Sequence, residues 1–244
     1  MKDLEVIGVV GAAGDLGGQL CVQSVAVGYE TIVYARNGHK IQTISGIDLV
    51  TRIRNINDKV VWSDSIKELL ERSDIVHWCV PLDALKEIDD IPASVKLVLH
   101  DSVMSRSRDA KAKLLERFPD ADIAIVHCLM NNDTMIVQAI GHTDGIGKHI
   151  KQLGMRTKQM DIVDHDTLMA HTQAPLAILC KLLLDDLNQH HADGLLTNSG
   201  QALRKSLIDR SAHWTEATYE AILSNPELPR LIKSMQKTID RYKV

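Results

Sequence analysis

Two polar residues in this 244-residue chain stand where a parallel sheet would hold its chemistry. Ser102 lies in His100-Asp-Ser-Val-Met-Ser105, directly after an apolar run, and His127 directly follows the apolar residues 123–126. A histidine at a strand end can exchange a proton near neutral pH, and a nearby serine hydroxyl can hold its tautomer or bind a substrate. A lone histidine in such a place can equally be structural. Both residues therefore depend on an element that brings a ligand to them.

The first residues of the chain supply such an element. The stretch Val6-Ile-Gly-Val-Val-Gly-Ala-Ala-Gly-Asp-Leu-Gly-Gly-Gln-Leu20 starts as a β-branched apolar run, turns through glycines and continues as a helix. Glycines permit a tight turn and close approach to a pyrophosphate, and the helix N-terminus attracts its charge. With a second strand at 31–34, this predicts a βαβ dinucleotide site; an ordinary strand-to-helix turn is the alternative. We expect the cofactor contacts in this turn to be Gly11, Ala13, Gly14, Asp15, Leu16 and Gly17.

The end of the second strand indicates which dinucleotide binds. A carboxylate there would accept hydrogen bonds from the ribose hydroxyls and repel a 2′-phosphate. Here Ala35 takes that position, and Arg36 and Asn37 follow it. A guanidinium with neighbouring donors suits a phosphate dianion. The sequence therefore favours NADP, bound through Ala35, Arg36 and Asn37. NAD is the alternative, because Arg36 can also be a solvated arginine that stacks on adenine.

Composition narrows the class of partner. The net charge is −4, with 28 basic and 32 acidic residues interspersed, so no basic patch indicates nucleic acid and a small molecule is the expected ligand. No signal peptide and no membrane-spanning segment is indicated. The cysteines are widely spaced and form no metal-ligand cluster, so we expect reduced thiols, a cytoplasmic protein and no metal site. These cysteines are Cys21, Cys79, Cys128 and Cys180.

The alternation of strands and helices predicts the architecture. Apolar strand-like runs recur at 60–62, 75–80, 97–99, 123–126 and 135–140, with helix-patterned pieces at 65–72 and 106–118 and one more unit over 146–160. This is an α/β pattern, a Rossmann-type doubly wound and mostly parallel sheet over residues 1–163. His77 falls inside one of its strands and is expected to be a packed side chain.

The remaining residues, 164–244, read as an all-α domain. Helices are predicted at 168–187, at 201–223 and from Pro226 through Tyr242. The first is apolar on more than one face, which is typical of a helix buried in a bundle or between subunits. We therefore expect this domain to carry the dimer interface of a homodimer.

The order of these pieces resembles the prephenate/arogenate dehydrogenase family over nearly the whole chain. The resemblance rests on the glycine turn, the strand of residues 74–81, the turn Asp101-Ser-Val103, the strand ending at His127 with Met130 after it, and the helix opening His165-Asp166 with Gln173. It adds Val80 and Pro81 to the expected cofactor contacts. No single one of these motifs is specific, and their succession carries the resemblance.

The resemblance implies an NADP-dependent dehydrogenase that oxidises and decarboxylates prephenate or arogenate in tyrosine biosynthesis. His127 would accept the proton of the ring hydroxyl as hydride leaves the same carbon for the nicotinamide. Ser102 would hydrogen-bond near both. His165 and Asp166 would stabilise the start of the first helix of the second domain.

Several positions depart from the family pattern. Cys128-Leu129 stands where the family has a proline, and Met104 replaces a lysine. Ala177 stands where a second histidine is usual, and Tyr219 and Glu220 stand where an arginine binds the substrate carboxylate. Two alternatives follow: a related dehydrogenase or reductase acting on another small hydroxy or imino acid, and a non-catalytic regulator that senses NADP.

Overall fold

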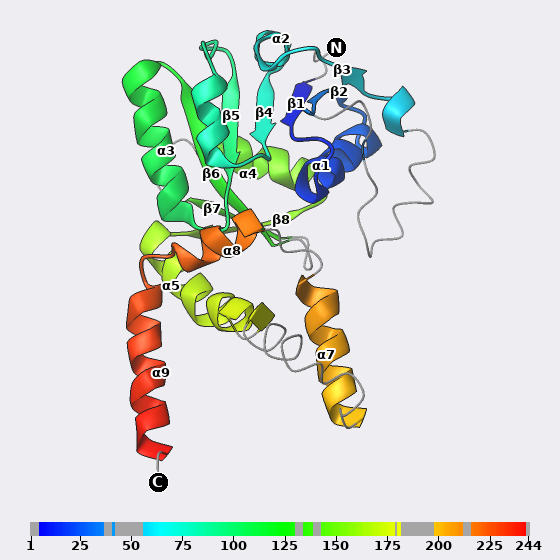
Figure 1. Cartoon of the computed structure of the whole chain (residues 1–244). Helices are drawn as coiled ribbons and strands as arrows, with labels where there is room; N and C mark the ends of the chain where they lie inside the picture. The colour runs from blue at the N-terminus through cyan, green and yellow to red at the C-terminus, as the bar shows by residue number, and fades with distance from the viewer. Residues whose placement is uncertain are drawn as a thin grey trace. The chain divides into compact units, whose positions relative to one another are not determined.

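The computed structural model describes residues 5–36, 41, 56–129, 134–138, 143–178, 180–181, 198–211 and 216–242. The chain divides into two compact units, Met1–Ile162 and Val163–Val244 (Figure 1). The first contains a sheet with helices on both faces, and the second is helical.

The described strands of the first unit form one sheet in the order β3-β2-β1-β4-β5-β6-β7-β8. All neighbouring pairs are parallel except β6 and β7. The carboxyl ends of β1, β2, β4 and β5 therefore meet at one edge of the sheet, where doubly wound folds bind ligands. The strands are β1 (Val6–Val10), β2 (Glu30–Tyr34), β3 (Val61–Trp62), β4 (Ile75–Trp78), β5 (Lys96–His100), β6 (Asp122–Leu129), β7 (Thr134–Gln138) and β8 (Arg156–Met160).

Helices cover both faces of this sheet, which confirms the predicted doubly wound fold (Figure 1). On one face α1 (Asp15–Ala26) and α4 (Thr143–Gln152) bury Leu20 and Ile146 against Val9 and Val98. On the other face α2 (Ile66–Arg72), α3 (Met104–Arg117) and the 3-10 helix η2 (Leu82–Glu87) form a second apolar cluster with the sheet. In β1, β5 and β6, residues from one strand contribute to both clusters, so one strand helps to build both cores.

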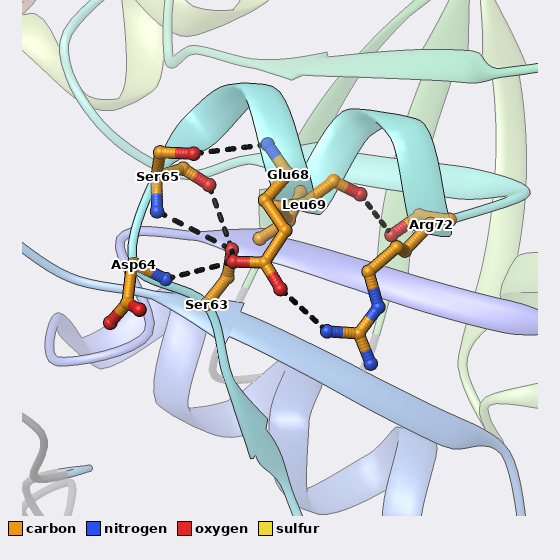
Figure 2. Close-up of polar contacts among 7 residues, drawn as sticks. Ser63, Asp64, Ser65, Glu68, Leu69 and Arg72 are labelled. Carbon is orange, nitrogen blue, oxygen red and sulfur yellow. Dashed lines mark hydrogen bonds and ion pairs between the residues drawn. The ribbon is translucent and has the colours of Figure 1, made fainter.

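A capping network fixes the start of α2, directly after β3 (Figure 2). Ser65 Oγ accepts a hydrogen bond from Glu68 N at 3.1 Å, and the Glu68 carboxylate accepts from Asp64 N and Ser63 Oγ. These bonds lower the pKa of Glu68, with Ser63 as the largest cause. The spacing Ser65-x-x-Glu68 is a capping box, which satisfies amide groups that open the helix. Arg72 then donates to Glu68 Oε1 at 2.7 Å along the same helix.

The second unit contains α5 (Ile162–Thr172), α7 (Asn198–Ser211), α8 (Glu216–Leu223) and α9 (Leu228–Tyr242) in its described residues. The predicted helix over 168–187 is wrong as one element: α5 ends at Thr172, and a new helical segment runs over 174–178. Pro175 explains the break, because proline lacks an amide hydrogen and clashes with the preceding turn. The predicted helix over 201–223 is two helices, α7 and α8. Among the described residues, no helix combines the length and the apolar character that crossing a bilayer requires.

The predicted strand over 123–126 is longer than expected. β6 runs from Asp122 to Leu129, so His127 lies within the strand and not after it. The reason is the antiparallel partner: β7 pairs with β6 through Val126↔Val137 to Leu129↔Thr134, beyond the last residue of β5. The tandem of α4 and β8 accounts for the unit predicted over 146–160.

Candidate functional site

Gly11 ties together the ends of three neighbouring strands. Its φ is +91°, a left-handed conformation that favours glycine. The amides of Gly11 and Ala12 donate to the Tyr34 carbonyl at the end of β2, at 2.8 and 3.2 Å. A Cβ on Gly11 would lie 2.8 Å from the carbonyl oxygen of Cys79, just after β4. The chain can make this turn between β2 and β4 only with a glycine here.

Gly17 lets α1 begin directly on this turn. A Cβ at Gly17 would overlap the carbonyl oxygen of Gly11, so the helix backbone packs on the turn itself. Gly14 is the N-cap residue and offers no side-chain hydrogen bond to the first amides. Gly14 and Asp15 are exposed, and Ala13 and Leu16 are half-buried. An uncapped helix N-terminus with exposed backbone and no Cβ in the way fits a pyrophosphate.

Other predicted cofactor residues lie near the same turn. The Val80 side chain is beside Gly11, since its Cγ1 is 2.7 Å from where a Gly11 Cβ would be, and Pro81 follows, exposed, at the start of η2. Ala35 is half-buried and directly follows Tyr34, the acceptor for the turn. Predicted Asn37 lies outside the described residues.

Arg36 has a partner that the sequence did not reveal. Its Nη2 lies 2.6 Å from Oε1 of Glu87, at the end of η2. Both side chains are accessible, with 67% and 39% of their area exposed. The bond joins the loop after β2 to the segment after β4, and it places a carboxylate beside the predicted phosphate-binding arginine. Nothing in the local sequence pattern pairs two residues 51 positions apart.

Ser102 is held in a tight turn at the end of β5. The Asp101 carboxylate accepts a hydrogen bond from Val103 N at 2.9 Å, and Arg106 Nε lies 3.8 Å from its other oxygen. Asp101 N also donates to the carbonyl of Val126 on β6, at 3.3 Å. Asp101 thus positions the half-buried Ser102 at the carboxyl edge of the sheet.

His127 lies at the same edge on the neighbouring strand. The last paired residues of β5 and β6 are His100 and Val126, so Ser102 and His127 both come just beyond the parallel ladder. His127 is half-buried and pairs in register with Ile136 of β7. The fold therefore places the two predicted catalytic residues on adjacent strands at the edge that holds the glycine turn.

Three buried histidines near this edge form a group that the sequence analysis did not predict. His77 Nδ1 lies 2.9 Å from His100 Nε2, and His77 Nε2 lies 2.9 Å from His149 Nε2. His77 is fully buried, as expected for a packed side chain, and the other two are nearly so. Burial lowers the pKa of all three, and neighbouring imidazoles lower it further for His77 and His100: that of His100 falls to about 3 and that of His149 to about 4. All three are therefore neutral at pH 7.

Within the second unit, two of the three positions that depart from the family pattern are part of an apolar core, and the third, Glu220, is exposed. Ala177 and Tyr219 belong to one cluster with Ala174, Ile222 and Leu228. Ala177 is completely buried, and Lys181 Nζ lies 5.3 Å from the centre of the Tyr219 ring. An apolar core thus stands where the resemblance would put a histidine and an arginine.

His165 and Asp166 also form a buried contact in the second unit. His165 Nδ1 lies 2.8 Å from Asp166 Oδ1, and Asn225 Nδ2 donates to the Asp166 carbonyl at 2.8 Å. Asn225 Oδ1 accepts from Glu227 N, just before α9. These bonds connect α5 to the start of α9, which is a structural role. In the described part of the chain, no group of three or more His, Cys, Asp or Glu residues is arranged as a metal site.

The doubly wound sheet followed by helices is the fold of nicotinamide-dependent dehydrogenases of the prephenate and arogenate type. The chain is similar to the prephenate dehydrogenase of Aquifex aeolicus, solved with hydroxyphenyl propionate and NAD+: the TM-score is 0.70 at 17% identity, covering 99% of this chain and 90% of the other. Synechocystis arogenate dehydrogenase matches with a TM-score of 0.55 at 16% identity, over 97% of this chain and 99% of the other.

The same fold extends to a different chemistry. A Streptomyces aurantiacus imine reductase matches with a TM-score of 0.55 at 13% identity, over 98% of this chain and 79% of the other. No protein-family model matches the sequence, and a search of curated proteins finds no significant match. At sequence identities this low, structural similarity establishes the shared fold alone. Evidence for the function has to come from the residues of the site.

The glycine turn generates a first prediction. Gly17→Ala should weaken NADP+ binding at least about ten-fold and lower the unfolding midpoint, because the added Cβ overlaps the Gly11 carbonyl oxygen. Calorimetric titration and urea unfolding measure the two effects. Gly147→Ala in α4 is the matched control: nothing lies within 4 Å of its Cβ, so binding should be unchanged. Equal binding by the Gly17 variant and wild type would contradict the assigned site.

The histidines generate a second prediction. Below the ordinary histidine pKa of 6.5, these histidines bind protons in the unfolded chain but stay neutral in the folded protein. The free energy of unfolding therefore decreases as the pH falls toward about 4. Each such histidine contributes up to ~1.4 kcal/mol per pH unit. His149→Gln should reduce this slope, measured by urea unfolding between pH 7 and pH 4. Glu5 and Tyr29 are the charged and aromatic neighbours that face His149 in the folded protein. His171→Gln, at an exposed position of α5, should leave the slope as it is, and equal slopes in all three proteins would refute the assignment.

Proposed function

We propose that this protein is an NAD(P)-dependent oxidoreductase acting on a small organic acid. The observation that carries the proposal is the turn from β1 into α1, where Gly11 and Gly17 leave no room for a Cβ and the helix N-terminus has no side-chain cap. Such a turn at the carboxyl edge of a doubly wound sheet suits a dinucleotide pyrophosphate. Gly14, Asp15 and the half-buried Ala13 and Leu16 would line it.

NADP is the proposed cofactor. Arg36 would bind the 2′-phosphate, with Ala35 leaving the space that a carboxylate would fill in an NAD site. The Arg36–Glu87 ion pair does not stand in the way, because pairs this exposed contribute little, typically under about 1 kcal/mol. A dianionic phosphate would make the stronger, bidentate partner for the guanidinium.

The proposed reaction is the oxidative decarboxylation of prephenate or arogenate. When bound, the nicotinamide ring supplies the hydride acceptor. His127 would take the proton of the substrate hydroxyl, and Ser102, held by the Asp101 turn, would hydrogen-bond beside it. Both residues come just beyond the parallel ladder at the edge where the cofactor would lie. Because aromatisation drives the loss of carbon dioxide, the protein mainly has to orient the ring and accept one proton.

The apolar cluster in the second unit favours a second candidate substrate class. With Ala177 and Tyr219 packed in a core, the chain lacks the histidine and arginine that the resemblance would use to hold the substrate. Losing a charged partner for a carboxylate costs a few kcal/mol of binding, enough to change the preferred substrate. Oxidation or reduction of another small hydroxy or imino acid is therefore the runner-up.

We further propose a cytoplasmic homodimer assembled through the helical unit. The four cysteines are free thiols, and three of them are buried, which suits a reducing compartment. Large apolar side chains of the helical unit are exposed in the single chain and would be covered by a second copy. They are Val163, Leu168, Ile208, Leu223 and Ile232.

A turnover assay tests the reaction. Purified protein with NADP+ and prephenate or arogenate should form reduced cofactor, followed by its absorbance. His127→Asn should lower kcat at least about hundred-fold while NADP+ binding is retained, because general acid–base catalysis contributes that much. No turnover with either compound, but turnover with another hydroxy or imino acid, would select the second candidate. Binding of NADP+ without any turnover would select the cofactor-sensing regulator.

The cofactor preference has its own test. Arg36→Ala should remove most of the preference for NADP+ over NAD+, and Glu87→Gln should increase it, because the carboxylate no longer competes with the phosphate. The measurement is Kd for each cofactor by titration. Arg72→Ala is the matched control, since Arg72 also pairs with a glutamate but lies on α2. An Arg36 variant with an unchanged preference would exclude the assigned phosphate site.

A further inference from the structure

His100, His77 and His149 form an unbroken chain of imidazoles through the interior of the first unit. They come from β5, β4 and α4, and their ring nitrogens are joined at 2.9 Å in both links. Both nitrogens of His77 are used, one toward each neighbour. The ring centres are 5.1 and 5.2 Å apart. This is hydrogen-bonding geometry, and the rings do not converge on a common centre as metal ligands would.

The two ends of this row of histidines lie at opposite edges of the sheet. His100 is the last residue of β5, directly before Asp101 and Ser102, and its Nδ1 is buried without a hydrogen-bond partner among the described residues. At the other end His149 Nδ1 faces Glu5, whose Oε2 is 3.9 Å away. Glu5 precedes β1 at the amino edge, and 41% of its side chain is exposed. That distance is too long for a hydrogen bond, and His149 Nδ1 is buried with no hydrogen-bond partner among the described residues, so the last transfer requires a side-chain movement of Glu5 or His149.

A neutral imidazole carries one N–H and one lone pair, so the chain allows two consistent arrangements of its protons. In one, His149 donates from Nδ1 toward Glu5, His77 donates from Nε2 to His149, and His100 donates from Nε2 to His77. The Nδ1 of His100 is then a bare acceptor. In the other arrangement every donor is reversed, and His100 carries its proton on Nδ1. The ionised Glu5 carboxylate can only accept, so it selects the first.

We propose that His100, His77 and His149 are a proton relay that connects the candidate site to Glu5. A proton taken up at His100 Nδ1 displaces the Nε2 proton to His77 Nδ1, and His77 passes its Nε2 proton to His149 Nε2. His149 then releases its Nδ1 proton to Glu5. One proton enters and one leaves, each imidazole stays neutral before and after, and the relay resets by the reverse shift or by ring rotation.

The use of the relay rests on the proposed function. Oxidation of a hydroxyl group releases a proton at the carboxyl edge of the sheet, and the relay would carry a proton from that edge to the solvent-accessible Glu5. Its groups are neutral at pH 7, so transfer does not begin from a trapped charge. Tyr29 lies beside His149, with ring centres 5.8 Å apart, and both burial and the Glu5 charge raise the pKa of Tyr29. The Glu5 charge therefore acts on Tyr29, the ring beside His149.

A static structural role is the competing explanation, and the two differ in one respect. In a relay the tautomer of His100 depends on the group at position 5, two histidines away. In a static cluster that Glu5 does not reach, the three coupled tautomers are set by the buried surroundings and are independent of position 5. Burying three polar side chains is costly unless they are satisfied, yet this cluster leaves both His100 Nδ1 and His149 Nδ1 without a hydrogen-bond partner among the described residues.

The test is NMR of the 15N-histidine-labelled full-length protein without ligand, which distinguishes Nδ1–H from Nε2–H rings. The wild type should show His149 as Nδ1–H and both His77 and His100 as Nε2–H. Glu5→Lys replaces an acceptor by a pure donor and should reverse all three, changing the His100 tautomer ratio by about ten-fold or more. Glu30→Lys, at the exposed start of the neighbouring β2, is the control and should change none.

The outcomes separate the relay from the proposed function. A change confined to His149 in the Glu5→Lys protein, or an imidazolium at any of the three positions at pH 7, would overturn the relay. Reversal of all three tautomers supports it, whether or not prephenate or arogenate is oxidised. If reduced cofactor forms in the turnover assay but the tautomers ignore position 5, the relay fails and the proposed function stands.

Discussion

The close contact of backbone with backbone at Gly11 is the constraint on which the candidate site depends. Parallel pairing brings the ends of β1, β2 and β4 to one edge, but strands alone do not make a binding site. At Gly11 the chain passes within contact distance of the Cys79 carbonyl while its own amide bonds to Tyr34. The first turn of α1 also packs on Gly11, because Gly17 has no Cβ that would overlap the Gly11 carbonyl oxygen. Side chains are excluded at both points, so the first turn of α1 packs directly on the glycine turn and its uncapped N-terminus lies at this edge.

The sequence was most informative where chemistry acts through local geometry. The glycine turn, the strand alternation and the positions of Ser102 and His127 follow from spacings of a few residues, and the doubly wound sheet followed from them. The extension of β6 through His127 could not be predicted, because it depends on pairing with β7 and not on the β6 residues themselves. The break after Thr172 could have been predicted from Pro175, whose effect on a helix is local.

Contacts between distant residues were out of reach of the sequence alone. Arg36 and Glu87 are 51 positions apart, and His77 and His149 are 72 apart, so no periodicity connects them. His77 was correctly expected to be packed inside a strand. Its hydrogen bonds to His100 and His149, which the sequence does not show, are what would allow it to transfer a proton. The capping box of α2 is the opposite case: Ser65-x-x-Glu68 is a visible local signal, and it explains why α2 begins where it does, directly after β3.

The apolar cluster of the helical unit has a consequence for how this chain could change over evolutionary time. Ala177 is completely buried in the same core as Tyr219, and Leu228 of α9 closes that core. A histidine at position 177 would add volume and polar atoms to a filled space, while an arginine at position 219 would bring a charge into it. Neither single step is neutral on its own. Because the two residues share one core, we expect either substitution to be tolerated only when a neighbouring core residue changes with it.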